Sequence, residues 1–334
     1  AYADGQTMQK RQSPKRKKSK PKESVRKKSK TTRQKKEQPS PAVILEKFTD
    51  KIEEEYNVIF KPNVGPQTDF LAASEREVLY GGSAGGGKSY AMLADPLRYM
   101  GNPAFSGLLL RHTTEELREL ITKSQEMYPK IWPGIKWSER KMQWTAPSGA
   151  KLWLSYLDKD QDVTRYQGLA FSWIGFDELT QWATPFAWSY MRSRLRSADP
   201  TLPLSMRATT NPGGRGHHWV KKMFIDPAPA GKSYIATDIE TGEQLKYPAG
   251  HEKAGRPLFK RRFIPARLKD NPYLAQQGDY EAMLLSLPEQ QRRQLLDGDW
   301  DIKEGAAFTE FNRSIHVVEP FVIPSNWVKF RACD

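Results

Sequence analysis

The residues with the clearest chemistry lie in one short glycine-rich segment. It follows an apolar stretch at residues 77–80, precedes a helix-compatible run at 90–98, and fits the phosphate-loop pattern G-x-x-x-x-G-K-[ST]. Glycines let the backbone curl so that consecutive N–H groups face a phosphate, and the start of a helix adds partial positive charge. The segment therefore predicts a nucleoside triphosphate site built from Gly82, Ser83, Ala84, Gly85, Gly86, Gly87, Lys88 and Ser89.

Two side chains of this segment and two acids further along the chain have the types that phosphoryl transfer needs. Lys88 can reach the β- and γ-phosphates, and the Ser89 hydroxyl can hold Mg²⁺. Residues 171–176 are apolar on both faces, as in a buried parallel strand, and they end in Asp177 and Glu178. We expect Asp177 to order water around Mg²⁺ and Glu178 to polarise the attacking water, so the pattern predicts an ATPase that uses ATP and Mg²⁺.

Strand and helix patterns alternate along most of the chain. Strands are expected at 107–110 and 204–209, a hairpin within 141–155, and helices at 42–56, 113–128 and 186–195, whereas Pro62, Gly65 and Pro66 predict a turn. This alternation predicts an α/β P-loop NTPase with a mainly parallel sheet flanked by helices. From Phe263 onward short charged helices, at 280–285 and 288–296, indicate a small helical lid subdomain.

These patterns divide the chain into four parts. We expect a disordered basic arm at 1–40, a P-loop ATPase core at 41–262, a helical lid or linker subdomain at 263–305, and a linker with the start of another domain at 306–334. The sequence contains no run of about 18 apolar residues, so no membrane span is expected. Its single cysteine, Cys333, excludes an internal disulfide.

The net charge of +14 is concentrated in the first part. Residues 1–40 hold 15 Lys and Arg against 3 Asp and Glu, and the rest of the chain is close to neutral. The run 10–36 has too few apolar residues to offset the entropy of ordering, which predicts disorder. Such an arm could bind nucleic acid through counterion release, dock on an acidic protein surface, or serve as a solubilising tail or leader.

Six segments occur in an order that resembles the ATPase half of the large terminase subunit of tailed bacteriophages. They lie at 66–71, 79–89, 166–168, 173–180, 207–212 and 298–300, and the resemblance covers residues 58–334. It implies a motor that drives double-stranded DNA into a prohead, with a portal protein and a small terminase subunit as partners. It also implies a homo-oligomeric ring that works in the host cell cytoplasm.

The resemblance assigns roles to polar residues outside the phosphate loop. Gln67 would read the adenine edge through paired hydrogen bonds, unless it is only a turn residue. The segment Thr209, Thr210 and Asn211 would sense the γ-phosphate and couple its loss to movement, unless it is only an Asn-Pro turn that ends a strand. Small polar groups at the end of a strand suit this role because parallel strands point into the nucleotide crevice there.

The cation that offsets charge on the transferring phosphoryl group is left open by the sequence. Some terminases carry an arginine inside the phosphate loop, and this chain has none there. Arg111, which follows the strand at 107–110, is the first choice because family members also place an arginine at that point. Arg194 and Arg196 are the alternatives, and a finger that acts in trans would require a ring of subunits.

The last residues resemble the first strand of an RNase H-type nuclease domain, the second half of the same family. The strand would run through 327–334, and Asp334 would be the first metal-binding acid. One carboxylate cannot form a two-metal site, so the chain as given is not expected to cut DNA.

Two other functions fit part of the pattern. A helicase or a cellular DNA pump would share the phosphate loop, but helicases of this type usually carry Ser-Ala-Thr where this chain has Thr-Thr-Asn-Pro. A non-catalytic docking module gated by nucleotide would be expected to have a damaged catalytic acid, and Glu178 is present.

Overall fold

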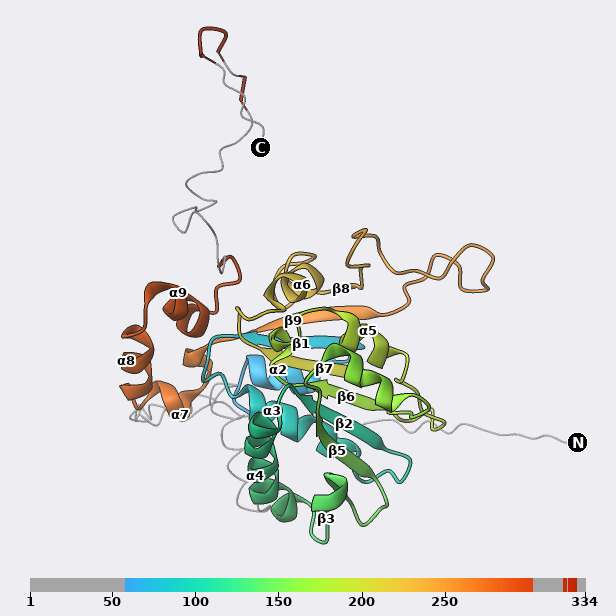
Figure 1. Cartoon of the computed structure of the whole chain (residues 1–334). Coiled ribbons are helices and arrows are strands. Elements are labelled where there is room, and N and C mark those ends of the chain that lie inside the picture. The colour runs from blue at the N-terminus through green and yellow to red at the C-terminus, as the bar shows by residue number, and fades with distance from the viewer. Residues whose placement is uncertain (1–57, 303–320, 323, 329–334) are drawn as a thin grey trace, which may run out of the picture. The chain divides into compact units, whose positions relative to one another are not determined.

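The structure is a computed structural model that describes residues 58–302, 321–322 and 324–328 (Figure 1). The expected arm at 1–40, the expected helix at 42–56 and Asp334 lie outside the described residues. The helices and short helical turns are α2 (Pro66–Ala72), α3 (Lys88–Ala94), η1 (Asp95–Tyr99), α4 (Thr114–Ile131), η2 (Glu139–Lys141), η3 (Asp160–Tyr166), η4 (Leu179–Gln181), α5 (Phe186–Arg192), α6 (His217–Val220), η5 (Lys221–Ile225), η6 (Leu268–Asp270), α7 (Pro272–Ala275), α8 (Asp279–Leu285), α9 (Glu289–Arg292) and η7 (Arg293–Asp297).

Nine strands of the described part form one sheet. They are β1 (Glu77–Gly82), β2 (Ser106–Arg111), β3 (Lys136–Ser138), β4 (Gln143–Thr145), β5 (Lys151–Tyr156), β6 (Trp173–Phe176), β7 (Ser205–Thr210), β8 (Ser233–Ile235) and β9 (Lys260–Ala266). Their order across the sheet is β3-β4-β5-β2-β6-β7-β1-β9-β8. The strands that lie from β5 to β9 in this order run parallel, and β3, β4 and β8 add antiparallel pairs at the two sides. The mainly parallel α/β fold expected from the sequence is confirmed.

Helices cover both faces of this sheet, so its central strands are buried on each side. Successive residues of β2 show the alternation: Leu108 and Leu110 pack with α5 and α6, whereas Leu109 packs with α3 and α4. Figure 1 shows α3 and α4 on one side of the sheet and α5 and α6 on the other. Among the helices that the structure describes, none is both long and apolar enough to cross a membrane.

Most of the expected core elements are confirmed. The helix expected at 113–128 is α4, and Thr113 caps it by accepting a hydrogen bond from the Glu116 amide. The hairpin expected within 141–155 is the antiparallel β4–β5 pair. The short helices expected near 280–296 are α8, α9 and η7. Of the strand expected at 327–334 only residues 327 and 328 are described, and neither lies in a strand.

Of two expected segment boundaries, one is wrong. The turn expected at Pro62, Gly65 and Pro66 lies at residues 64–65, and Pro66 begins α2, because proline suits the first turn of a helix, where its missing N–H would have no partner. Phe263 does not begin the helical part but lies inside β9, which pairs with β1 along its length. The pattern Lys260-Arg261-Arg262 suggests a surface segment, yet the Arg261 side chain is 1% exposed because it pairs with buried Glu77.

The parallel arrangement decides where the site residues meet. The chain leaves β1, β6 and β7 at the same edge of the sheet, since these strands are neighbours and run in one direction. The glycine-rich loop, the acid pair and the Thr-Thr-Asn segment follow or end these three strands. The carboxyl edge of the sheet therefore collects the expected functional residues, as in other open parallel sheets.

Candidate functional site

The glycine-rich loop joins the end of β1 to the start of α3. Gly82, Gly85 and Gly87 have positive φ values of 142°, 75° and 75°. A side chain is excluded at Gly82, because its Cβ would lie 2.2 Å from the Ala266 carbonyl oxygen. The loop thus takes the curled form that a phosphate-binding loop needs, directly before a helix N-terminus.

Lys88 leaves the first turn of α3 and points across the loop. Its Nζ donates hydrogen bonds to the Ser83 carbonyl oxygen at 2.6 Å and to Asn211 Oδ1 at 2.7 Å. Burial lowers the pKa of Lys88, and the charges of Glu178 and Asp177 oppose this shift only in part. A buried ammonium whose pKa is lowered gains from an added anion, which is the property expected of a phosphate ligand.

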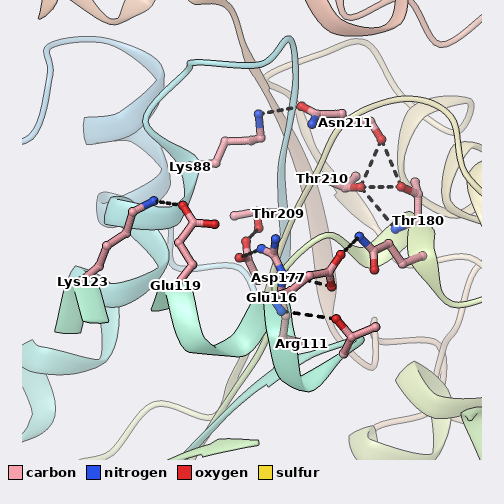
Figure 2. A network of polar contacts seen from close by, with 12 residues as sticks. Lys88, Arg111, Glu116, Glu119, Lys123, Asp177, Thr180, Thr209, Thr210 and Asn211 are labelled. Atoms are coloured by element: carbon pink, nitrogen blue, oxygen red, sulfur yellow. Dashed lines mark hydrogen bonds and ion pairs between the residues drawn. The ribbon is translucent and has the colours of Figure 1, made fainter. Parts of the chain in front are cut away.

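Asp177 follows β6, and its carboxylate is almost completely buried. Thr209 of β7 donates to one carboxylate oxygen, and Arg111 at the end of β2 pairs with the other (Figure 2). Burial would lower the pKa of Arg111, but the charges of Asp177, Glu178 and Glu116 raise it above its usual value. Arg111 is therefore held inside its own chain, with only 11% of its side chain exposed.

Glu178 has an unusual backbone for a residue with a side chain. Its φ of 58° and ψ of 56° lie in the left-handed region, which costs about 1–3 kcal/mol and is common at functional sites. Burial and the charge of Asp177 raise the pKa of Glu178, whereas Lys88, Arg111 and a hydrogen bond from the Asn211 backbone act against the rise. The carboxylate is thus held where its negative charge is poorly compensated.

The segment at the end of β7 touches both the loop and the acid pair. Asn211 contacts Lys88 through its side chain, and Thr209 at the other end of the segment donates to Asp177. Thr210 Oγ1 lies 2.7 Å from Thr180 Oγ1, and Thr180 Oγ1 also donates to the Asn211 carbonyl oxygen at 3.2 Å. Figure 2 shows the contacts that link Lys88, Asn211, Thr210 and Thr180.

Gln67 lies in α2 against the end of the glycine-rich loop, and its amide is engaged. Its Nε2 donates to the Gly87 carbonyl oxygen at 2.9 Å, and its Oε1 accepts a hydrogen bond from the Asn63 backbone at 2.6 Å. Its side chain is buried, with 4% of the residue exposed. The expectation that Gln67 reads the adenine edge stays a prediction.

The structure adds loop contacts, from the end of β9 and from the helical residues after it, that sequence reasoning missed. The Ser83 amide donates to the Ala266 carbonyl oxygen at 2.8 Å, and the Ala84 amide donates to the Leu295 carbonyl oxygen at 2.6 Å. Asn271 Nδ2 donates to the Gly85 carbonyl oxygen at 2.7 Å. The amides of Ser83 and Ala84 are therefore occupied within the chain.

Residues 298–300 are one of the six segments that carry the family resemblance, and they lie in the helical part that contacts the loop. Gly298 has a φ of 64°, and a Cβ there would lie 2.7 Å from the Ser83 amide nitrogen. Trp300 stacks on His217 with ring centroids 5.3 Å apart, and His217 accepts a hydrogen bond from the Gly213 amide at 2.8 Å. The end of the helical part therefore packs on the loop and on the turn that follows Asn211.

Arg194 and Arg196 lie away from this site. The Phe171 amide donates to the Arg194 carbonyl oxygen, and the Arg196 amide donates to the Phe171 carbonyl oxygen. Phe171 precedes β6, so both arginines are at the amino edge of the sheet, opposite Asp177. Neither is brought to the loop of its own chain, and Asp334 lies outside the described residues.

The donor set at the carboxyl edge fits Mg²⁺ better than a softer metal. A hydroxyl at Ser89 and a carboxylate at Asp177 are oxygen ligands, and Mg²⁺ takes few protein ligands beside waters and substrate phosphates. Within the described ranges no group of three or more His, Cys, Asp or Glu side chains could hold a metal by itself.

Comparisons with known proteins give one family and several similar structures. Residues 79–315 match the family model described as terminase large subunit, T4likevirus-type, N-terminal. No curated protein sequence matches the chain. The large terminase of a thermophilic bacteriophage in complex with ADP is similar at 17% identity and a TM-score of 0.51, over 79% of this chain and 60% of that chain.

Two further structures are similar to the chain. Another crystal form of the same thermophilic phage enzyme matches at 18% identity and a TM-score of 0.52, again over 79% of this chain and 60% of that one. The large terminase ATPase domain of Thermus phage P74-26 matches at 12% identity and a TM-score of 0.45, over 72% of this chain and 94% of that one. The chain thus spans about 60% of the length of the thermophilic phage enzyme, with which it shares the fold.

Proposed function

Because the chain belongs to the family of T4-type terminase large subunits, in which it matches the N-terminal part, we propose that it is the ATPase of a DNA-packaging motor. In this proposal it binds ATP at the glycine-rich loop and hydrolyses it to move double-stranded DNA into a prohead. One observation carries the proposal beyond family membership. The segment 209–211 contacts both the loop and the acid pair, because Asn211 Oδ1 accepts from Lys88 Nζ at 2.7 Å and Thr209 donates to Asp177. Nucleotide binding, hydrolysis and coupling are therefore expected to meet at this segment.

The proposed hydrolysis uses four residues in separate roles. Lys88 binds the β- and γ-phosphates. Their negative charge compensates the buried ammonium, which the acids of the protein compensate only in part. Ser89 and Asp177 hold Mg²⁺, which when bound neutralises part of the phosphate charge. Glu178 orients the attacking water and accepts its proton, a role for which a carboxylate with a raised pKa is suited.

We propose that Asn211, Thr210 and Thr209 carry the loss of the γ-phosphate to the rest of the protein. The side chain of Asn211 binds the same ammonium that would bind the γ-phosphate, so the two compete for Lys88. Thr210 and Thr180 tie this segment to η4, which follows Glu178. Loss of the γ-phosphate from Lys88 would therefore change the contacts of Asn211, and through Thr210 and Thr180 those of η4.

The contacts of Arg111 support a role in the site of its own subunit. It pairs with Asp177 of the same chain and is mostly buried, which does not suit a side chain offered to a neighbour. We propose that it stabilises charge on the transferring phosphoryl group in cis. Arg194 and Arg196, at the opposite edge, would serve only a neighbouring subunit's site.

The remaining assignments extend the same proposal. Residues 267–302 serve as a lid on the loop, and residues 1–40 as a basic arm. The motor acts in the host cell cytoplasm as a homo-oligomeric ring, with a portal protein and a small terminase subunit as partners. The role of Asp334 as the first metal-binding acid of a nuclease domain stays a prediction.

ATP hydrolysis with and without double-stranded DNA tests the proposal. We expect hydrolysis that DNA stimulates, and a loss of about 10²-fold or more in Glu178→Gln with ATP still bound, because the water loses its base. The exposed Glu115→Gln is the matched control and should hydrolyse ATP normally. A wild-type chain that binds but does not hydrolyse ATP would indicate a docking module instead.

A further inference from the structure

Three consecutive carbonyl groups of the glycine-rich loop each accept a hydrogen bond from a side chain. The Gly85 carbonyl accepts from Asn271 Nδ2 at 2.7 Å, and the Gly86 carbonyl from Tyr80 Oη at 2.7 Å. The Gly87 carbonyl accepts from Gln67 Nε2 at 2.9 Å. We call Asn271, Tyr80 and Gln67 the carbonyl caps.

The caps come from three separate parts of the fold. Tyr80 lies in β1, Gln67 in α2, and Asn271 directly before α7 in the helical residues after β9. They are buried: Tyr80 is 0%, Gln67 4% and Asn271 9% exposed. Hydrogen bonds in such surroundings are not exchanged with water, so losing one leaves the Gly85 or Gly86 carbonyl without that partner. The Gly87 carbonyl also accepts from the Ala91 amide at 3.2 Å.

Peptide geometry links these carbonyls to the groups that would bind phosphate. In a trans peptide the C=O of one residue and the N–H of the next point in opposite directions. Holding the carbonyls of Gly85, Gly86 and Gly87 on the outside of the loop therefore turns the N–H groups of Gly86, Gly87 and Lys88 toward its inside. Successive N–H groups with this orientation form an anion-binding concavity.

A run of glycines would not hold this form by itself. Glycine loses more conformational freedom on ordering than any other residue, so a free loop would lose affinity each time it had to order around a ligand. The caps lie directly against the loop: a Cβ at Gly87 would meet Gln67 Nε2 at 2.7 Å. The Tyr80 hydroxyl is protonated near neutral pH and able to donate, and burial raises its pKa further.

We propose that Asn271, Tyr80 and Gln67 are positioning residues that hold the loop amides ready for the triphosphate group. The inference rests on the proposed function, in which this loop binds ATP. It assigns Gln67 to the phosphates through the loop and not to the adenine. It also makes the helical part contribute directly to phosphate affinity through Asn271.

Binding of ATP and of inorganic tripolyphosphate, measured on the full chain by calorimetry, tests the inference. Tyr80→Phe removes one hydroxyl, and Gln67→Glu and Asn271→Asp each replace a donor with a carboxylate oxygen. We expect each variant to bind both ligands about tenfold more weakly, the worth of one buried hydrogen bond, because the caps act on the loop and not on the base. The KM for ATP should rise by the same factor, with kcat changed less.

Tyr128→Phe is the matched control. The Tyr128 hydroxyl is also buried and donates to a backbone carbonyl, that of Leu93, but it lies away from the loop. We expect this variant to lose thermal stability as Tyr80→Phe does and to bind both ligands like the wild type. If Tyr80→Phe does not fold, Gln67→Glu and Asn271→Asp decide the question.

Three results would count against the inference in different ways. Variants that bind both ligands as tightly as the wild type would overturn it alone. A Gln67→Glu variant that weakens ATP but not tripolyphosphate would restore the adenine role and remove Gln67 from the caps. A wild-type chain that binds neither ligand would overturn the proposed function and the inference with it.

Discussion

The two edges of the central sheet both bury a carboxylate against arginine, and they do so with opposite consequences. At the amino edge Glu77, the first residue of β1, lies 2.5 Å from Arg192 Nε and 2.7 Å from Arg261 Nε and is fully buried. At the carboxyl edge Asp177 pairs with Arg111, and Glu178 follows it. The residue types are the same, but the balance of charge differs.

The pKa shifts express this difference. Burial would raise the pKa of Glu77, but Arg261 and Arg192 more than reverse the effect and hold it below its ordinary value. At the carboxyl edge burial raises the pKa of Glu178 and lowers that of Lys88. The amino edge thus compensates its buried charge within the protein, whereas the carboxyl edge leaves charge that a nucleotide can compensate.

The comparison separates buried charges that stabilise the fold from buried charges that serve a ligand. Burial of an ionised group is unfavourable unless the group is paired with an opposite charge. The poorly compensated charges at the carboxyl edge therefore cost stability and call for a functional explanation. Functional sites are where such perturbed groups gather. Variants at each edge test whether the amino edge stabilises the fold and the carboxyl edge serves the ligand.

The largest effect is expected from Arg111, the arginine of the carboxyl edge. Arg111→Ala should lower kcat for ATP roughly 10³-fold, the scale of an arginine that stabilises the transferring phosphoryl group. If Arg111 acts in its own subunit, mixing Arg111→Ala with Lys88→Ala subunits restores no hydrolysis at any ratio. Recovery in the mixture would mean that the arginine is donated across a subunit interface, and would make the contact with Asp177 a resting arrangement.

Glu77→Gln should change stability and leave the nucleotide site intact. Removing one partner of a buried ion pair costs about 3 kcal/mol, so the free energy of unfolding at pH 7 should fall by that amount while ATP affinity is unchanged. Denaturant titration of the variant beside Glu115→Gln measures it. Weakened ATP binding in a variant that is still folded would contradict the assignment of the amino edge to stability alone.

The pH dependence of this effect has a definite sign. Because the pKa of Glu77 is lower in the folded chain, its contribution is complete above the unfolded pKa of about 4.3 and is lost as the pH falls through the folded value. The difference in unfolding free energy between wild type and Glu77→Gln should therefore shrink below about pH 4. A difference that stays constant into acid would mean that Glu77 is not held ionised by its arginines.

A smaller and more selective effect is expected from Asn211. Asn211→Ala removes a hydrogen bond from the Lys88 ammonium. We expect the rate of DNA packaging to fall about tenfold, the scale of one such hydrogen bond, and the rate of basal hydrolysis to fall less. Packaging rate and hydrolysis rate measured on the same preparation separate the two. Equal losses would show that Asn211 only positions the nucleotide.

The smallest effect on the site is expected from the basic arm at residues 1–40, which belongs to neither edge of the sheet. Deleting residues 10–36 should leave hydrolysis without DNA unchanged, since every site residue follows Asn63. An arm that neutralises about six phosphates gives a slope near −5 for log affinity against log salt, so the deletion should flatten that slope. An unchanged slope would assign the arm to a protein partner or to a leader.

Much of the carboxyl edge could be predicted from the sequence because its signals are local. The loop pattern, the acids that end an apolar strand and the Thr-Thr-Asn-Pro segment each occupy a few adjacent residues. Parallel strands then bring their ends to one edge, so the fold class was enough to place Lys88, Asp177 and Asn211 together. The hydrogen bonds of Asn211 with Lys88 and of Thr209 with Asp177 needed the structure.

The features that sequence reasoning missed depend on partners far along the chain. Asn271 caps the Gly85 carbonyl across 186 residues, and Arg261 finds Glu77 across 184. Without Glu77 the three basic residues that open β9 resemble a surface segment, and no strand was expected at 260–266. No local pattern in 266–272 indicates that Asn271 would face the loop.

The most direct test compares Glu178→Gln with Glu77→Gln in the same two measurements, ATP turnover and the free energy of unfolding. If the carboxyl edge serves chemistry and the amino edge serves stability, Glu178→Gln loses about 10²-fold or more in turnover with its stability retained. Glu77→Gln then loses about 3 kcal/mol of stability and keeps turnover per folded molecule. Near-wild-type turnover in Glu178→Gln, or lost turnover in folded Glu77→Gln, would contradict the account.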